Sequence, residues 1–305
     1  MRVAAVDIGT NTVRLLLADV VGDRGHLRVE NVARHEIVTK LGEGLDAAGR
    51  LGPEPMARAL AGLSYYAGLI DDSRATRMGG VATAATRSAA NGDEFVSRVA
   101  EVLGFHPRVI DGVEEARLTF VGATNALDPV ASYGVVDVGG GSTEFVIGAH
   151  APEYAISIDI GSVRLTERFQ QLAIEGLVAQ RRYVDSLLVG VSPPHPPAML
   201  LGSGGTFVTV AAVHGDLSKD DAEQSENLAL TIGELAATVE NLQQMSVAEI
   251  ADLPGVVPAR AGVLKAGAIC AERAVAHLGV SEVTISVSDI LDGLALHLVE
   301  EDLAS

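Results

Sequence analysis

The sequence predicts an α/β protein built from two related halves. Its 305 residues, 48% of them apolar, are enough for about two domains with buried cores. Short apolar runs typical of strands alternate with apolar residues spaced three to four apart, which are typical of helices. One short pattern also occurs twice, 130 residues apart. We therefore expect one domain over residues 1–127 and another over 128–305, with a last helix at about 289–300 able to pack back on the first domain.

The first half predicts a hairpin followed by alternating helices and strands. Strands are expected at 3–6, 13–20, 79–83 and 109–110, and helices at 53–70, 91–103 and 113–126. Pro53 suits the first turn of a helix, and Asn91 suits a helix N-cap. The turn at 7–12 joins two strands directly, so the chain opens with a hairpin and not with a strand that leads into a helix.

The second half begins after Asp128-Pro129 with another strand, turn and strand, over 133–148. The acidic, polar stretch 216–227 predicts an exposed loop. The other elements are expected as a helix at 163–188, a strand at 198–201, helices at 232–244 and 258–278, a strand at 283–287 and a helix from 288 or 289 to about 300.

The negative charge is concentrated in the second half. The chain has 40 acidic and 22 basic residues, a net charge of −18, of which residues 1–117 carry −2 and residues 118–305 carry −16. Long-range repulsion then opposes the binding of nucleic acids and of anionic membrane surfaces. A polyanionic ligand is expected at a local basic patch, which the first half is better able to supply.

Several other classes of protein are excluded by simple counts. No run of 18 apolar residues predicts a membrane span, and the N-terminus lacks the layout of a signal peptide, so we expect a cytoplasmic protein. A single cysteine, Cys270, cannot form an internal disulfide or a thiolate metal cluster. P-loop, Rossmann and nucleophile-elbow motifs are absent, and the eight histidines show no metal-ligand spacing. The oligomeric state, monomer or homodimer, is left open.

The repeated pattern is the most informative feature of the chain. It reads VDIGTNT at 6–12 and VDVGGGS at 136–142, and a third glycine turn, LGSGGT at 201–206, also follows an apolar strand. Glycine lets backbone N–H groups approach a ligand closely, and turned amides form a nest for phosphate oxygens. Two related halves that each present a glycine hairpin predict ligand binding in the cleft between them.

The aspartates Asp7 and Asp137 within the repeat indicate a metal. A carboxylate about 4 Å from a phosphate is repelled by roughly 4 kcal/mol per charge pair at an effective dielectric near 20. A divalent cation between them removes this conflict, and hard oxygen ligands indicate Mg²⁺.

Two further features have two interpretations each. Glu114 and Glu115 begin a helix, where acidic residues stabilise the helix dipole, or where one carboxylate points into the cleft. Arg87 follows a buried strand and is either a phosphate-binding side chain or a solvated loop residue.

Taken together, the motifs resemble the exopolyphosphatase/guanosine pentaphosphate phosphohydrolase (Ppx/GppA) family. The segments that carry the resemblance are DIGTNTVRL (7–15), EEAR (114–117), DVGGGSTE (137–144), DIGSVRLTE (159–167), GSGGT (202–206) and SDILDG (288–293). The resemblance runs from residue 1 to about 297 and is closest to short, two-domain members. It implies the actin/Hsp70/sugar-kinase fold, with each domain a mixed sheet flanked by helices.

The resemblance also implies roles for individual residues. Glu115 would be the catalytic base that activates water, and Arg87 would neutralise the terminal phosphates. Asp7, Asp137 and Glu144 would place Mg²⁺. The implied phosphate-binding residues are Thr10, Asn11, Arg14, Gly139, Gly140, Gly141, Ser142, Gly204, Gly205 and Thr206.

The expected activity is release of orthophosphate from inorganic polyphosphate. The same residues are compatible with removal of the 5′-phosphate of pppGpp, and less so with an ATP-binding kinase of the same fold. A sensor without activity has no need of a base such as Glu115. The acidic second half lacks a long basic channel, so we expect short or medium polyphosphate chains as substrates.

Overall fold

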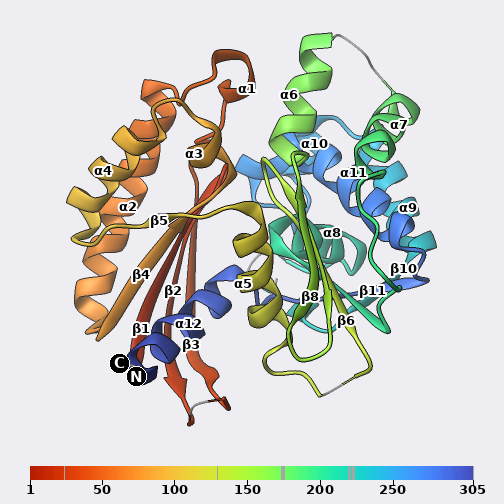
Figure 1. The fold of residues 1–305 in the computed structure, drawn as a ribbon. Helices are drawn as coiled ribbons and strands as arrows, with labels where there is room; N and C mark the ends of the chain where they lie inside the picture. Colours follow the sequence, from red (N-terminus) through yellow and green to blue (C-terminus); the bar gives the residue numbers. More distant parts are fainter. Residues whose placement is uncertain (24, 129, 173–175, 219–220, 222–223, 305) are drawn as a thin grey trace. The chain divides into compact units, whose positions relative to one another are not determined.

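The protein is described by a computed structural model that covers residues 1–305 except 24, 129, 173–175, 219–220, 222–223 and 305. The chain forms two compact units. The first unit contains Met1–Leu127 and Ser288–Ser305, and the second contains Asp128–Val287. The chain therefore passes between the units twice, and its last helix groups with the first unit (Figure 1). In the described parts of the chain, no helix combines the length and apolarity that a membrane span requires.

The first unit is built on a five-stranded mixed sheet. Strand order is β3-β2-β1-β4-β5, with bounds Arg28–Val38, Thr12–Val21, Arg2–Ile8, Arg77–Ala82 and Arg108–Val109. The pairs β1–β2 and β2–β3 are antiparallel, whereas β1–β4 and β4–β5 are parallel. The hairpin predicted at the start of the chain is confirmed.

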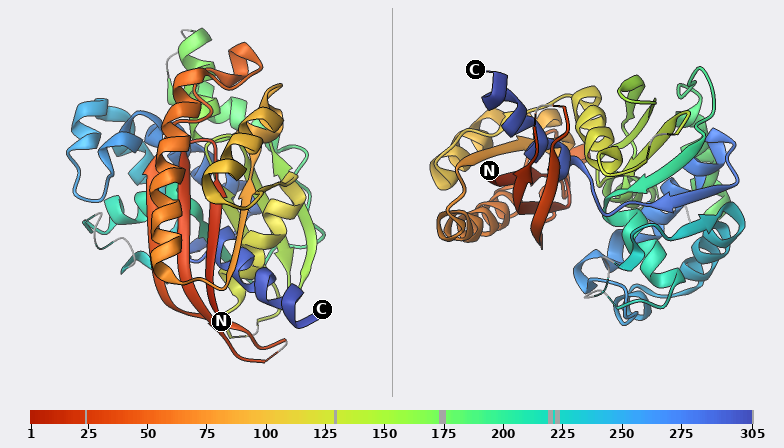
Figure 2. Two further views of the ribbon diagram at one scale, coloured as in Figure 1. Left: turned by 90° about the vertical axis from the view of Figure 1, so that its left-hand side faces the viewer. Right: turned by 90° about the horizontal axis from the view of Figure 1, so that it is seen from below.

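Helices cover both faces of this sheet (Figures 1 and 2). The helices of the unit are α1 (Leu45–Ala48), α2 (Pro53–Ser73), α3 (Ala84–Ser88), α4 (Gly92–Leu103), α5 (Gly112–Thr124) and α12 (Ile290–Ala304). Side chains alternate along a strand, so each strand serves two cores. On β1, Val6 and Ile8 pack with α2 and α4, whereas Val3 and Ala5 pack with α5 and α12. By the same alternation Asp7 lies on the face covered by α5 and α12.

The second unit is built on a six-stranded mixed sheet. Strand order is β10-β11-β9-β6-β7-β8, with bounds Ala229–Thr231, Glu282–Ile285, Met199–Ser203, Tyr133–Val138, Thr143–Gly148 and Pro152–Ile158. The pairs β6–β7 and β7–β8 are antiparallel, and β6–β9 and β9–β11 are parallel. Leaving out β10, the order and directions repeat those of the first unit. The internal repeat seen in the sequence is thus a repeat of the whole sheet.

One buried core of the second unit combines its helices with alternate residues of β6 and β7. The helices are α6 (Ser162–Leu172), α7 (Leu177–Leu188), α8 (Gly204–His214), α9 (Ile232–Gln244), α10 (Val247–Ala251) and α11 (Ala261–Leu278), with a 3-10 turn at Pro258–Arg260. Val136 and Phe145 belong to this core. Asp137 and Glu144 alternate with them and lie on the other face of the sheet.

Two local predictions were wrong. The single helix expected at 163–188 is divided into α6 and α7, and Gly176 precedes α7 with a φ of 121°, which does not fit a continuous helix. Asn91 stands at the N-cap of α4, but its side chain does not cap the helix. It hydrogen-bonds instead to the backbone N–H and C=O of Leu51, and so fixes a neighbouring loop.

Candidate functional site

The two glycine hairpins have the same backbone geometry. In the first unit, the Gly9 N–H donates to Thr12 O at 2.9 Å, and in the second the Gly139 N–H donates to Ser142 O at 3.0 Å. A Cβ on either glycine would lie 3.2 Å from the carbonyl oxygen that accepts this bond, closer than usual. The repeat therefore builds the same tight turn at the end of the first strand of each sheet.

In the first hairpin, Asp7 is buried and ion-paired. It stands directly opposite Arg14 in the β1–β2 register. Its Oδ2 accepts bonds from Arg14 Nε at 2.9 Å and Nη2 at 2.6 Å. Burial nevertheless raises the pKa of Asp7, and the Arg14 guanidinium offsets only part of this effect. The second oxygen, Oδ1, is buried without a hydrogen-bond partner, so a proton or a cation there would stabilise the carboxyl group.

Thr10 and Asn11 form the tip of the first turn and are buried. Their carbonyl oxygens accept bonds from the following loop: Thr10 O from the Gly42 N–H at 2.8 Å, and Asn11 O from the Lys40 N–H at 2.9 Å. The Asn11 Oδ1 atom is buried without a partner. Backbone hydrogen bonds from the 39–42 loop therefore hold this turn in place. That the Thr10 and Asn11 side chains bind phosphate stays a prediction.

In the second hairpin, the residue opposite the aspartate is another carboxylate. Asp137 pairs in register with Glu144 on β7, and Glu144 pairs with Ser157 on β8. Directly opposite side chains lie about 4.5–5.5 Å apart between their Cβ atoms, and like charges there are destabilising. Glu144 is 2% exposed, and its Oε1 accepts a bond from Ser157 Oγ at 2.6 Å. A cation at this pair would offset the repulsion.

The glycine turn of the second hairpin is fixed by the start of α6. Gly139 O accepts a bond from the Ser162 N–H, and Gly140 O accepts from the Val163 N–H, both at 2.9 Å. A Cβ on Gly161 would lie 2.5 Å from the Gly140 carbonyl carbon, so only glycine allows this approach. Gly141 and Ser142 complete the turn and are buried.

The third glycine segment, Gly204-Gly205-Thr206, is the first turn of α8. Gly204 has a φ of +82°, and a Cβ there would lie 2.1 Å from Asp137 Oδ1. Thr206 Oγ1 donates to Val138 O at 2.9 Å. These contacts bring the segment directly against the second hairpin. Arg260 also lies against it, because a Cβ on Gly205 would be 1.7 Å from Arg260 Nη1.

Glu115 and Arg87 meet in the first unit. Glu115 lies in the first turn of α5, which Asp111 caps by accepting from the Val113 and Glu114 N–H groups. Arg87 Nη1 lies 3.3 Å from Glu115 Oε2 and donates to Ile110 O at 2.9 Å. Glu115 keeps 13% of its side chain exposed and Arg87 keeps 25%, so both remain accessible to a ligand. The adjacent Glu114 instead pairs with Arg108.

The residues present fit a magnesium ion held partly by a substrate. Within the described ranges, no three or more His, Cys, Asp or Glu side chains gather in a group that could hold a metal. Mg²⁺ is commonly bound through one or two carboxylates together with phosphate oxygens and water. Within the second unit, the opposed Asp137 and Glu144 supply such a pair.

The structure brings together the expected residues of each hairpin and adds three to which the sequence analysis gave no role in the site. Asp289 binds Arg14, Ser157 binds Glu144, and Arg260 lies against Gly205. Ser157 and Arg260 had no signal of their own in the sequence. Asp289 did, because Asp289 and Asp292 have the spacing of a capping box before an apolar helix.

Comparison with known proteins finds one family over most of the chain. The family model of the Ppx/GppA phosphatase family matches residues 20–301. Exopolyphosphatase 2 of Mycobacterium tuberculosis is 37% identical over 97% of this chain and 98% of its own length. A crystal structure of an exopolyphosphatase-like protein has a TM-score of 0.89 at 30% identity and covers 99% of this chain and 100% of its own.

The Aquifex aeolicus PPX-GPPA enzyme has a TM-score of 0.79 at 28% identity, covering 97% of this chain and 99% of its own. These similarities extend over both units. The expected α/β fold with two domains, each containing a mixed sheet flanked by helices, is confirmed, and its assignment to the actin/Hsp70/sugar-kinase type stays a prediction. The chain belongs to the Ppx/GppA phosphatase family.

Proposed function

We propose that this protein is an exopolyphosphatase, a Mg²⁺-dependent enzyme that removes the terminal phosphate of inorganic polyphosphate as orthophosphate. Membership of the family makes the chain a phosphoanhydride hydrolase. The choice of polyphosphate rests on one observation, the similarity over nearly both full lengths to a protein named exopolyphosphatase 2. The geometry of the two hairpins and of the Arg87–Glu115 pair supports the same chemistry.

In the proposed reaction, water attacks the terminal phosphorus, and the bond from that phosphorus to the bridging oxygen breaks. Orthophosphate leaves on one side, and the chain shortened by one phosphate leaves with the bridging oxygen. The Glu115 carboxylate accepts the proton of the attacking water, a step that contributes roughly 10²–10⁴-fold to the rate in general base catalysis. Arg87, which already lies against Glu115, orients this carboxylate and offers its guanidinium to the phosphate oxygens.

The protein would hold Mg²⁺ through Asp137 and Glu144, with Asp7 as a third carboxylate. When bound, the ion neutralises phosphate charge, which is the main requirement of phosphoryl transfer to water. Thr10 and Asn11 in one turn, and the glycine turn 139–142 in the other, bind phosphate oxygens in this proposal. Arg14 was expected to bind phosphate as well, but its guanidinium bonds to two carboxylates, so a phosphate would have to compete with them.

The substrate is proposed to be a short or medium chain. Residues 118–305 carry a net charge of −16, which repels the distal part of a long polyanion. Turnover per chain end should therefore fall as the polyphosphate lengthens from tens to hundreds of phosphates.

The test is orthophosphate release from polyphosphates of defined length, with and without Mg²⁺, by the wild type and two variants. Glu115→Gln should lower kcat by about 10²–10⁴-fold with little change in KM, because it removes a group that acts in the transition state. Glu114→Gln is the matched control: this neighbour in the same helical turn pairs with Arg108, and its kcat should stay within about twofold. Near-normal turnover by Glu115→Gln would reject the assigned base.

Including pppGpp in the same assay tests the alternative substrate. If the wild type removes the 5′-phosphate of pppGpp with a higher kcat/KM than it shows for any polyphosphate, the protein is a guanosine pentaphosphate phosphohydrolase. Phosphate release that requires a second acceptor substrate would instead indicate a kinase of the same fold.

A further inference from the structure

Helix α12 begins with two buried aspartates that cap it reciprocally, a variant of the capping box in which the first side chain accepts from the second helical residue. Asp289 precedes the helix, and its Oδ1 accepts a bond from the Leu291 N–H at 2.9 Å. Asp292 returns the contact, because its Oδ2 accepts a bond from the Asp289 N–H at 3.0 Å. The two residues are 5% and 3% exposed. This arrangement satisfies backbone donors at the helix start, a task that Ser, Thr or Asn at the first position performs equally well.

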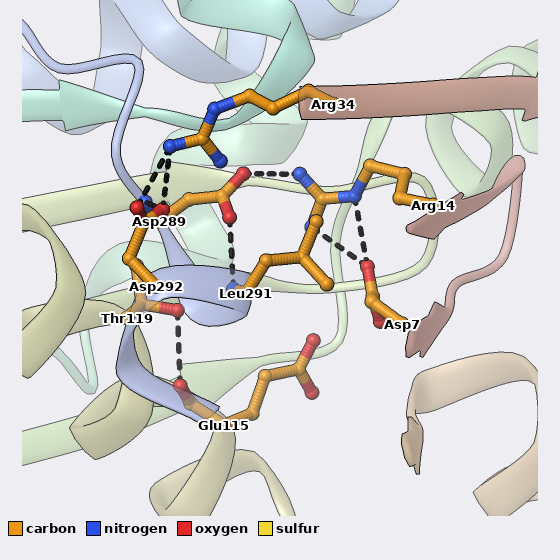
Figure 3. A network of polar contacts seen from close by, with 8 residues as sticks. All are labelled: Asp7, Arg14, Arg34, Glu115, Thr119, Asp289, Leu291 and Asp292. Atoms are coloured by element: carbon orange, nitrogen blue, oxygen red, sulfur yellow. Dashed lines mark hydrogen bonds and ion pairs between the residues drawn. The ribbon is translucent and has the colours of Figure 1, made fainter. Parts of the chain in front are cut away.

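The same two aspartates also bind arginines of the sheet (Figure 3). Asp289 Oδ2 accepts a bond from Arg14 Nη1 on β2. Asp292 accepts bonds from Arg34 Nη2 on β3 at 2.7 and 2.9 Å. Arg14 simultaneously donates to Asp7 through Nε and Nη2, so its guanidinium bridges Asp7 and Asp289. A neutral capping residue would leave this partly buried arginine with one carboxylate fewer.

The first turn of α12 is also fixed against α5, the helix that carries Glu115. A Cβ on Gly122 would lie 1.9 Å from Asp289 O, and a Cβ on Gly293 would lie 2.0 Å from Leu118 O. The two helices therefore cross at backbone contact, which only glycine permits at these positions. As a result, Asp289 is held in place relative to both Arg14 and α5 (Figure 3).

We propose that Asp289 is a positioning residue of the active site. It fixes the guanidinium of Arg14, which in turn holds Asp7 through Oδ2 and leaves the buried Oδ1 available to a cation. Asp289 touches neither substrate nor metal in this scheme. The expected effect of Asp289 on turnover rests on the proposed function. The scheme explains why the residue that caps α12 is an aspartate: capping alone requires no charge, whereas holding Arg14 does.

The variant that tests this is Asp289→Asn, because asparagine caps a helix as well as aspartate but carries no charge for Arg14. Asp292→Asn is the matched control. Asp292 is as buried as Asp289 and lies in the same helical turn. The variant loses the same kind of ion pair, but the partner is Arg34 and not Arg14. Any effect of a weakened capping box or of general destabilisation should be common to both variants.

The first readout does not depend on catalysis. The Arg14 Nε–H group can be followed by NMR in protein labelled with ¹⁵N-arginine, and its signal is assigned by its loss in Arg14→Gln. In the wild type this proton donates to buried Asp7 and should exchange slowly with water. Asp289→Asn should speed this exchange by at least about fivefold, whereas Asp292→Asn should leave it unchanged.

The second readout is turnover of polyphosphate. Asp289→Asn should lower kcat by about 10-fold, with KM changed by less than about threefold, a size typical of groups that orient a functional side chain. Asp292→Asn should stay within about twofold of the wild type. In an Arg14→Gln background, Asp289→Asn should lower kcat by less than a further factor of about two, since both changes break the same ion pair.

Three results would overturn the proposal: unchanged exchange and kcat in Asp289→Asn, equal losses in Asp292→Asn, or losses that multiply in the Arg14→Gln background. If Asp289→Asn does not fold, as judged by circular dichroism, Asp289→Ser caps the helix without charge and takes its place in every comparison. A wild type inactive on polyphosphate would reject the proposed function, while the exchange measurement would still decide whether Asp289 holds Arg14.

Discussion

The hairpin β1–β2 of the first unit and the hairpin β6–β7 of the second share their turn, their strand directions and their place in the sheet. Their cross-strand neighbours differ. In the first unit, Asp7 faces Arg14, and Arg14 faces Glu36 on β3. In the second unit, Asp137 faces Glu144, which faces Ser157 on β8.

This difference divides the chemistry between two copies of one scaffold. The first copy neutralises its aspartate internally, with a guanidinium that also reaches Asp289. The second copy places two carboxylates opposite each other and supports one of them with a hydroxyl group. Two like charges directly opposite each other repel, and a bound cation reduces this repulsion, so we expect the second hairpin to be the principal magnesium site.

The largest effect should follow from removing one charge of the second pair. Glu144→Gln keeps the size of the side chain and can still accept from Ser157, but it leaves Asp137 as the only charge of the pair. We expect turnover at a fixed low Mg²⁺ concentration to fall at least about 100-fold, and the Mg²⁺ concentration for half-maximal activity to rise at least about tenfold. Orthophosphate release measured over a Mg²⁺ titration provides both values.

Glu153→Gln is the control for that experiment. Glu153 lies on the neighbouring strand β8 with 56% of its side chain exposed, so its loss should leave the titration unchanged. An unaltered Mg²⁺ requirement in Glu144→Gln would mean that the second hairpin is not the metal site, and that the two copies do not differ in the way proposed.

A smaller effect is expected from the hydroxyl group that supports Glu144. Ser157→Ala removes the 2.6 Å bond to Glu144 Oε1 without changing any charge. Loss of a partner that orients a metal ligand typically lowers metal affinity or activity by about 10–100-fold. We therefore expect the Mg²⁺ concentration for half-maximal activity to rise about 10-fold. Ser157→Thr keeps a hydroxyl group in a strand that accepts β-branched residues, and it should restore most of the loss. Equal Mg²⁺ titrations of Ser157→Ala and the wild type would contradict this role.

Much of this comparison could be predicted from the sequence. The repeated motif located both hairpins and both aspartates, because the turn requires glycine at fixed positions next to an apolar strand. The helices expected to begin at residues 53 and 232 do begin there, as α2 and α9. The break between α6 and α7 was missed, since a single glycine in a helical pattern does not by itself end a helix.

The connections between distant segments could not be predicted. Asp289 and Arg14 are 275 positions apart, and their ion pair depends on which unit receives the last helix and on the glycine contacts between α5 and α12. Likewise, the pairing of Glu144 with Ser157 depends on the register of β8, a strand that the sequence pattern did not reveal. Sequence motifs therefore identified the charged residues of the hairpins. The residues that hold those side chains in place could be identified only from the fold.

The smallest effect is a change in the stability of the folded protein when the charge of Asp7 is removed. It distinguishes this buried aspartate from an ordinary surface carboxylate. Because burial raises the pKa of Asp7, the folded protein binds a proton there more tightly than the unfolded chain does. The stabilisation from that proton is complete below the unfolded pKa and is lost as pH rises through the higher folded pKa. Ionised Asp7 therefore costs stability near pH 7, and Asp7→Asn should remove this cost while Asp289 continues to neutralise Arg14.

We expect Asp7→Asn to raise the melting temperature at pH 7 by about 2–4 °C, equivalent to about 1 kcal/mol in a protein of this size, measured by calorimetry in EDTA. The gain should shrink as pH falls, because Asp7 of the wild type then becomes protonated. Asp93→Asn, at an exposed position in the first turn of α4, should give no such gain. A lower melting temperature for Asp7→Asn at pH 7 would show that the ion pair with Arg14 outweighs burial, and that the first hairpin gains stability from its charged pair.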